Sequence, residues 1–149
     1  MSLEQQLTSE LKDAMRAKDQ LRLEALRAIK SAILLVKTQS GAEETLTEAQ
    51  EIQLLQKLVK QRRDSAAIFK EQNRSDLAQP EEDQAAIIAA FLPQQLSVAE
   101  VETIVEKIIA ETGASSMKDM GRVMGAANQQ MAGQADGKTI SSIVKNKLS

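Results

Sequence analysis

The sequence has 149 residues, of which 42% are hydrophobic and 27% are charged, the balance of a folded globular domain. It contains neither cysteine nor histidine, which excludes disulfide bridges, thiolate ligands and the commonest general base. The net charge is −2, with 13 Lys/Arg against 11 Asp/Glu in residues 1–74 and 6 against 10 in residues 75–149. Binding of nucleic acid through bulk charge is thereby excluded, and any such contact needs a local basic patch.

Aromatic residues are almost absent: the sequence contains two phenylalanines and neither tyrosine nor tryptophan. The core must therefore be built from Leu, Ile, Val, Met and Ala, which suit helices, and no stretch alternates as a strand would. We expect an all-α fold. The longest apolar run, 85–92, is too short to cross a bilayer, and the N-terminus has no secretory pattern. We therefore expect a cytoplasmic protein without a membrane partner.

Two helices are predicted before residue 41. Apolar residues recur every four positions from Leu3 to Met15, and Ser2 is a suitable N-cap for this first helix. Asp19 can cap a second, longer helix that continues to the break at Ser40-Gly41. These two helices should pack as an antiparallel hairpin. The apolar stripe of the second helix consists of Leu23, Leu26, Ile29, Ile33 and Val36.

Two more helices are predicted before residue 93. Thr47 and Gln50 have the spacing of a capping box, which predicts a helix from there to about Asn73. Pro80 suits the first position of the next helix, and acidic residues follow it in the opening turn.

A subdomain boundary is predicted at Pro93, because Ser97 and Glu100 begin a further capping box shortly after it. We therefore expect an N-terminal multihelical subdomain with a long helical hairpin over 1–93. A smaller C-terminal three-helix subdomain should cover 97–149, with helices over residues 98–111, 116–131 and 137–148.

The segment Gly133–Thr139 resembles a phosphate-binding loop, but three residues separate its glycines where four are needed, and an apolar helix precedes it. We interpret Gly133 as the end of one helix and Asp136 as the cap of the next. Several acidic residues could in principle hold Mg²⁺, but their positions in a first helical turn or on a solvated helix face already explain their presence. They are Glu81, Glu82, Asp83, Glu102 and Glu106. No catalytic residue, metal site or cofactor is predicted.

Two long stretches resemble the YqeY family. Residues 57–97 contain the elements KQRRDS, DL and LPQQLS, and residues 113–149 contain GASSMKDMGRVMG and GQADG. The resemblance covers essentially the whole chain. It implies a helical relative of the tail domain in the B subunit of tRNA-dependent amidotransferases, a region understood to contact tRNA. The catalytic parts of that enzyme lie in other domains or subunits, so the resemblance implies binding and not turnover. A label of carbon–nitrogen ligase with glutamine as amido donor would be inherited from the larger enzyme.

The tRNA contact implied by this resemblance would use two sets of cations. One set lies in the C-terminal part and consists of Lys118, Arg122, Lys138, Lys145 and Lys147, and the other consists of Lys60 and Arg63. Gln134 and Asp136 stand where the larger subunits tend to have basic residues, which weakens a phosphate contact at that loop. Arg62 falls on an apolar stripe, so we expect a structural ion pair with a carboxylate such as Asp64, Asp76 or Asp83.

The leading hypothesis is a non-catalytic helical module that binds tRNA by shape and a few cations. The alternative is a protein–protein interaction adaptor that docks on an amidotransferase or another translation protein. An enzyme is the third hypothesis, and the sequence offers least for it because no nucleophile has a base beside it.

Overall fold

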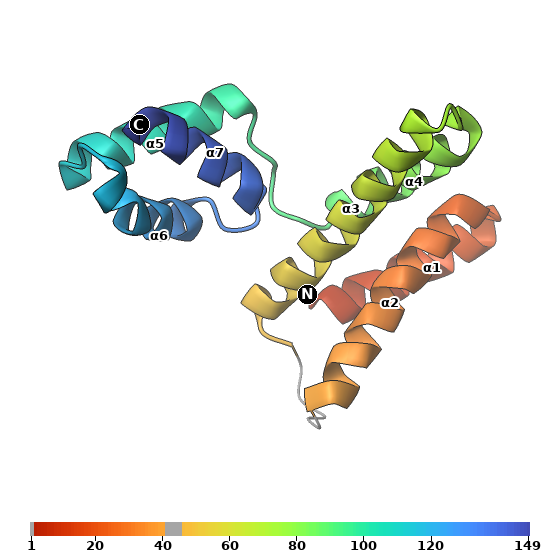
Figure 1. The fold of residues 1–149 in the computed structure, drawn as a ribbon. Helices are drawn as coiled ribbons and strands as arrows, with labels where there is room; N and C mark the ends of the chain where they lie inside the picture. Colours follow the sequence, from red (N-terminus) through yellow and green to blue (C-terminus); the bar gives the residue numbers. More distant parts are fainter. Residues whose placement is uncertain (1, 41–45) are drawn as a thin grey trace. The chain divides into compact units, whose positions relative to one another are not determined.

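A computed structural model describes residues 2–40 and 46–149, and every regular element in these ranges is a helix (Figure 1). The all-α prediction is confirmed. The chain forms two compact units, Met1–Leu92 and Pro93–Ser149, which we call the first and the second unit. The domain bounds expected from the sequence, 1–93 and 97–149, stay a prediction, since a compact unit need not fold alone. Within the described ranges, no helix combines the length and apolar character that a membrane span requires.

The first unit contains four helices: α1 (Leu3–Ala17), α2 (Gln20–Ser40), α3 (Glu48–Glu71) and α4 (Ser75–Ala89). Helix α1 packs against α2, α2 packs against α4, and α3 and α4 form the most extensive pairing (Figure 1). The predicted break after Ser40 falls at Gly41, which lies outside the described residues.

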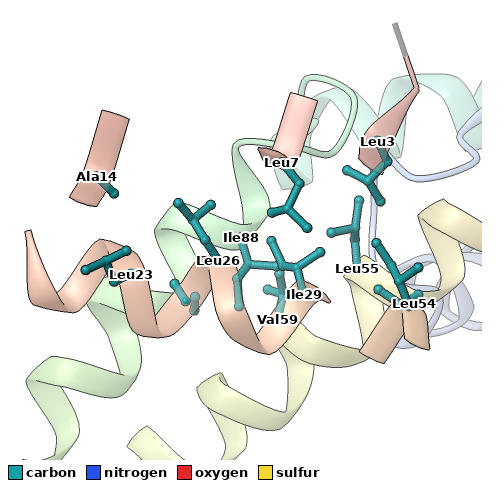
Figure 2. Close-up of a cluster of buried hydrophobic side chains, with 13 residues drawn as sticks. Leu3, Leu7, Ala14, Leu23, Leu26, Ile29, Leu54, Leu55, Val59 and Ile88 are labelled. Carbon is teal, nitrogen blue, oxygen red and sulfur yellow. The ribbon is translucent and has the colours of Figure 1, made fainter. Parts of the chain in front are cut away.

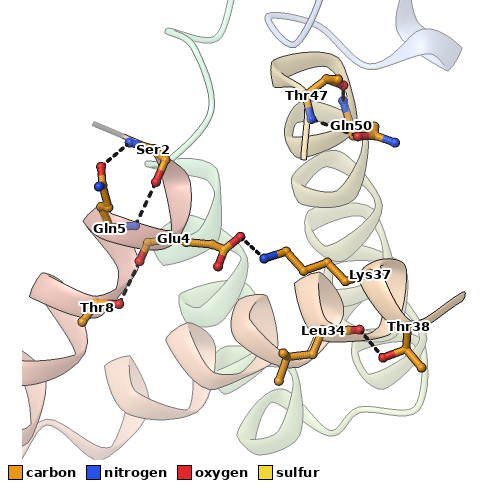
Figure 3. A network of polar contacts seen from close by, with 9 residues as sticks. All are labelled: Ser2, Glu4, Gln5, Thr8, Leu34, Lys37, Thr38, Thr47 and Gln50. Atoms are coloured by element: carbon orange, nitrogen blue, oxygen red, sulfur yellow. Dashed lines mark hydrogen bonds and ion pairs between the residues drawn. The ribbon is translucent and has the colours of Figure 1, made fainter. Parts of the chain in front are cut away.

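The helix starts follow the capping signals of the sequence. Ser2 and Gln5 exchange side-chain and backbone hydrogen bonds, and Thr47 and Gln50 do the same at the start of α3 (Figure 3). Asp19 accepts a 3.1 Å hydrogen bond from the backbone N–H of Arg22, as an N-cap does. These three predicted caps are confirmed.

The core of the first unit gathers aliphatic side chains from all four helices (Figure 2). Helix α2 contributes the stripe expected from the sequence, with Leu26 and Ile29 fully buried. The expectation that Met15 continues the α1 stripe is wrong, because Met15 is 58% exposed and Ala14 is buried in its place. A four-residue repeat drifts by 40° per step around a helix of 3.6 residues per turn, so three steps carry Met15 120° away from Leu3.

Helix α4 begins five residues earlier than expected. Pro80 lies in its second turn and not at its first position, because the backbone carbonyl of Arg74 already accepts hydrogen bonds from Leu77 and Ala78. Asn73, with a φ of 60°, reverses the chain between α3 and α4. A proline so close to the helix start removes only one early backbone hydrogen bond, which the extensive packing on α3 compensates.

The second unit contains α5 (Val98–Thr112), a 3₁₀ turn η1 (Met117–Asp119), α6 (Met120–Gln130) and α7 (Gly137–Leu148). The single helix expected over residues 116–131 is therefore divided into η1 and α6. Ser97 and Glu100 form the predicted capping box of α5, and Gly113 ends that helix with a φ of 69°. Gly133 does not end a helix as expected, because α6 ends at Gln130 with Met131 as its cap, and Gly133 lies in the following turn with a positive φ of 75°. Asp136 caps α7 as predicted.

A separate aliphatic core holds the second unit together. Its buried side chains come from α5, α6, α7 and the loop before α7, and they are Val101, Val105, Ile108, Val123, Ala127, Met131, Ala135, Ile140, Ile143, Val144 and Leu148.

Candidate nucleic-acid interface

Helix α7 carries three lysines and no acidic residue. Lys138 and Lys145 are exposed, whereas Ile140 and Val144 are buried against α5 and α6. Seven residues are close to two helical turns, so Lys138 and Lys145 extend from the same side of α7, about 10 Å apart along the axis. No hydrogen bond or ion pair engages either ammonium group within the described part of the chain. These two lysines therefore remain available to a ligand.

Polar, uncharged residues complete this side of α7. Ser142 and Asn146 are exposed and follow Lys138 and Lys145 around the helix. We call these four residues the α7 face. Hydroxyl and amide groups can donate to or accept from phosphate and ribose oxygens, and the lysines supply the charge. The α7 face thus has the chemistry of a small phosphate-binding surface.

Lys147, by contrast, is occupied within the unit. Its ammonium group donates a 2.7 Å hydrogen bond to Glu106 of α5. That hydrogen bond, the charge of Glu106 and the nearby charge of Glu102 raise the pKa of Lys147. This pair joins α7 to α5, so Lys147 extends to the flank of α7 and away from the α7 face.

Arg122 is also engaged. Its guanidinium lies 3.0 Å from Asp119, and the other carboxylate oxygen of Asp119 accepts a 3.0 Å hydrogen bond from the backbone N–H of Ser115. The hydrogen bond from Ser115 is the main cause that lowers the pKa of Asp119, and the charge of Arg122 adds to it. This carboxylate therefore ties the end of η1 to the backbone that precedes it.

Lys118 is exposed on η1, which packs against α7. No partner holds its ammonium group among the residues that the structure describes. Of the five cations predicted in the C-terminal part, Lys118, Lys138 and Lys145 are therefore available, and Arg122 and Lys147 are held by acidic partners.

The two remaining predicted cations lie on α3, in the first unit. Lys60 forms a 2.9 Å ion pair with Asp64 one turn later. Arg63 is exposed at the rim of a shallow hollow between α3 and α4. They form a cluster of their own, whose surroundings differ from those of the α7 face.

Arg62 has a structural role, but the expectation that its partner is a carboxylate is wrong. Its Nε donates a 3.1 Å hydrogen bond to the side-chain oxygen of Gln84, and Gln84 donates in turn to Glu24 at 3.1 Å. A neutral amide therefore relays the contact between α3, α4 and α2. The carboxylates expected for Arg62 have other partners: Asp64 pairs with Lys60, Asp76 with Arg74 and Asp83 with Gln79.

A set of hydrogen bonds that the sequence did not predict, which we call the latch, joins the segment before α5 to the loop between α6 and α7. The side-chain amide of Gln95 donates to the backbone carbonyls of Gly133, at 2.6 Å, and Pro93, at 2.8 Å. The backbone N–H of Leu96 donates to the carbonyl of Gln134, and the side chain of Gln134 donates to the carbonyl of Gln94. A glutamine two residues after a proline in a polar linker gives no signal of this pairing, because its partner Gly133 is 38 residues away.

A family model described as Yqey-like protein matches residues 4–148. The chain belongs to the YqeY family. Three curated relatives share the name "Altered inheritance of mitochondria protein 41, mitochondrial". The one from Clavispora lusitaniae is 35% identical over 84% of this chain and 71% of its own length. Those from Lachancea thermotolerans and Vanderwaltozyma polyspora are 36% and 34% identical over 74% and 76% of this chain, and over 59% and 64% of their own lengths.

Two of the elements that resemble the YqeY family contain residues that lock loops. In GASSMKDMGRVMG, Asp119 binds the backbone before η1, and in LPQQLS, Gln95 binds the carbonyl of Gly133 in the GQADG element. These residues have a structural explanation that needs no ligand. Within residues 2–40 and 46–149, no three acidic side chains converge as a metal site would require.

Proposed function

We propose that this YqeY-family chain is a non-catalytic RNA-binding module and that its ligand is tRNA. The observation that carries the proposal is the α7 face, where Lys138 and Lys145 point outward together without an acidic partner. Structured RNA is commonly recognised by shape and by contacts to phosphate and 2′-hydroxyl groups, which needs no aromatic platform. The resemblance to the amidotransferase B-subunit tail supports tRNA over other folded RNAs.

The number of available cations limits the strength of binding. Lys118, Lys138 and Lys145 would contact about two or three phosphates, so the logarithm of the binding constant should fall by about 2 per tenfold increase in salt. The chain as a whole is acidic, which reduces long-range attraction. Binding should therefore be weak at physiological salt and clear at low salt.

A mobility shift with purified tRNA over a salt series tests this proposal. Lys145→Glu should weaken binding about tenfold or more at low salt, because it replaces attraction with repulsion on the α7 face. Lys107→Glu is the matched control, because Lys107 is exposed on α5 in the same unit and the change in charge is the same. Equal losses in both variants would reduce the effect to net charge and would contradict a specific α7 face.

Turnover is not part of this proposal. A carbon–nitrogen ligase activity with glutamine as amido donor would belong to a larger amidotransferase, and this chain resembles only the tail domain of the B subunit of that enzyme. The purified chain should release no ammonia from glutamine and should not amidate a mischarged tRNA. Either reaction would replace the binding proposal with an enzymatic one.

The proposal places the protein in the cytoplasm, where tRNA is abundant. The curated relatives carry a mitochondrial name, so the compartment needs a direct test. Fractionation of the host cell, with the protein followed by antibody, gives it. Recovery in an organelle fraction would contradict the cytoplasmic placement and leave the RNA proposal intact.

A further inference from the structure

Two large aliphatic side chains lie next to each other on the outer surface of α2, in the first unit. Leu34 is 54% exposed and Leu35 is 58% exposed, and no other large hydrophobic residues of the described ranges are exposed in succession. A leucine that stands alone on a surface is common and needs no explanation. Two in succession straddle the outward side of a helix, because neighbouring residues are about 100° apart around its axis. Together they form an apolar patch on the surface.

Two cations share this side of α2. Arg27 and Lys30 are exposed, and Leu34 follows them at the helical spacings of seven and four residues. No hydrogen bond or ion pair engages either cationic side chain within residues 2–40 and 46–149. Ser31 is also exposed and lies between the cations and the leucines. We call Arg27, Lys30, Ser31, Leu34 and Leu35 the α2 face.

The other charged groups of α2 near this face have partners on neighbouring helices. Glu24 is the one acidic residue of α2, and its carboxylate accepts a 3.1 Å hydrogen bond from Gln84 of α4. Lys37, farther along the helix, pairs with Glu4 of α1 (Figure 3). No acidic residue follows Glu24 in α2. The α2 face therefore presents two positive charges and an apolar patch to an occupant, and a negatively charged occupant complements them.

The order of these residues along α2 argues against an anionic membrane surface. The two cations precede the two leucines by about 9 Å along the helix axis. A helix that lies on a bilayer needs its cations beside its apolar residues, because charge and hydrocarbon form layers there. Insertion of α2 by its C-terminal end would bring the leucines into the hydrocarbon, but it would carry the ion pair of Lys37 and Glu4 with them. Neither orientation suits the α2 face.

A protein helix fits the α2 face better than RNA does. Aliphatic side chains give a base no ring to stack on, so RNA would leave the leucines without a partner. A helix laid along α2 can bring carboxylates to the cations and aliphatic residues to the leucines, because both helices rise by about 1.5 Å per residue. It also satisfies its own backbone hydrogen bonds, which an extended segment beside the leucines would not. The short side chain of Ser31 lets such a helix approach closely.

We propose that the α2 face docks an acidic amphipathic helix of a partner protein. Two carboxylates of the partner, about one turn apart, bind Arg27 and Lys30. Its aliphatic residues, between one and two turns farther along, cover Leu34 and Leu35. The proposal goes beyond RNA binding and is independent of it, because no residue of the α7 face takes part.

Methyl NMR of the full chain, labelled at leucine, tests the proposal with a defined probe. The probe is a helix-forming peptide with two glutamates about one turn apart and two leucines between one and two turns farther along. One control peptide has glutamine in place of glutamate, and the other has serine in place of leucine. The methyl signals of Leu34 and Leu35 should move with the probe. Each control peptide should bind at least about tenfold more weakly, because each lacks one of the two kinds of contact.

Variants sharpen the same experiment. Arg27→Glu and Leu34→Ser should each weaken binding of the probe about tenfold, because one reverses a charge and the other removes an aliphatic contact. Lys57→Glu and Ile68→Ser are matched controls, since both residues are exposed on α3 and make the same changes outside the α2 face. These controls should change the affinity by less than about twofold. Thermal unfolding followed by circular dichroism shows whether each variant remains folded.

The docking proposal would be overturned if the signals of Leu34 and Leu35 did not move at millimolar probe, or if Arg27→Glu left the affinity unchanged. Movement of these signals with protein concentration alone would assign the α2 face to a second copy of the chain. Movement with vesicles that contain phosphatidylserine would assign it to a lipid surface, and movement with tRNA would assign it to RNA. Each of these assignments would replace the proposal. Absence of a mobility shift with tRNA would contradict the RNA proposal and leave this one standing.

Discussion

The two units of this chain differ in the side-chain contacts that hold their helices and loops in place. The first unit uses helices of up to 24 residues, and side chains connect them to one another, as in the relay from Arg62 through Gln84 to Glu24. The second unit uses helices of 11–15 residues, and its side chains bind backbone groups in the loops, as Gln95 and Asp119 do. Short helices leave more backbone polar groups outside regular structure, and those groups need partners. We therefore expect side-chain contacts to loop backbone to contribute more to the stability of the second unit.

The largest expected effect comes from the core of the first unit. Leu26→Ala should lower the free energy of unfolding of that unit by about 2–5 kcal/mol, because Leu26 is fully buried and its removal leaves a cavity. Leu35→Ala is the matched control on the same helix, since Leu35 is 58% exposed, and it should cost less than about 1 kcal/mol. Urea titration followed through methyl NMR signals measures each unit separately. An equal shift in the midpoint of the second unit would contradict independent domains at 1–93 and 97–149.

A smaller effect is expected from the latch of the second unit. Gln95→Ala removes two hydrogen bonds and leaves the buried carbonyl of Gly133 without its donor, which should cost about 1–3 kcal/mol. Gln94→Ala is the control, because Gln94 takes part in the latch only through its backbone carbonyl. The same urea titration checks both variants. If Gln94→Ala proved as costly as Gln95→Ala, the side-chain latch would not explain the loss.

The smallest effect concerns acid stability. The lowered pKa of Asp119 means that its contribution is present above the ordinary aspartate value of about 4 and is lost as pH falls through the lowered value in the folded unit. Asp119→Asn keeps an acceptor for the N–H of Ser115 but cannot titrate. Its unfolding midpoint should therefore depend less on pH between about 5 and 2 than that of the native chain. Parallel pH curves for the two proteins would show that Asp119 does not stabilise the turn.

The helix starts could be predicted from the sequence because their determinants are local. Ser2, Thr47 and Ser97 each find their partner three residues away, so the pattern is visible without a fold. The start of α4 could not be found in this way, because it depends on the reversal at Asn73 and the pairing with α3, and Pro80 gave a stronger local signal at the wrong place.

The candidate RNA site was predictable in part. Charge and helix geometry already placed Lys138 and Lys145 on one acid-free helix. That Lys147 would be held by Glu106, 41 residues away, depends on how α5 and α7 pack, and no local pattern reports it. The Gln84 amide in the relay could not be predicted for the same reason, because its contact with Arg62 arises only when α3 and α4 lie side by side.

The three reciprocal caps at Ser2, Thr47 and Ser97 also bear on how the chain acquires its structure during synthesis. Each is complete as soon as four consecutive residues have left the ribosome, so the first turn of α1, α3 and α5 can be selected before any tertiary partner exists. Contacts of such low sequence separation cost little loop entropy and favour rapid folding. We therefore expect nascent helical turns to mark these three points early and the long-range contacts to follow.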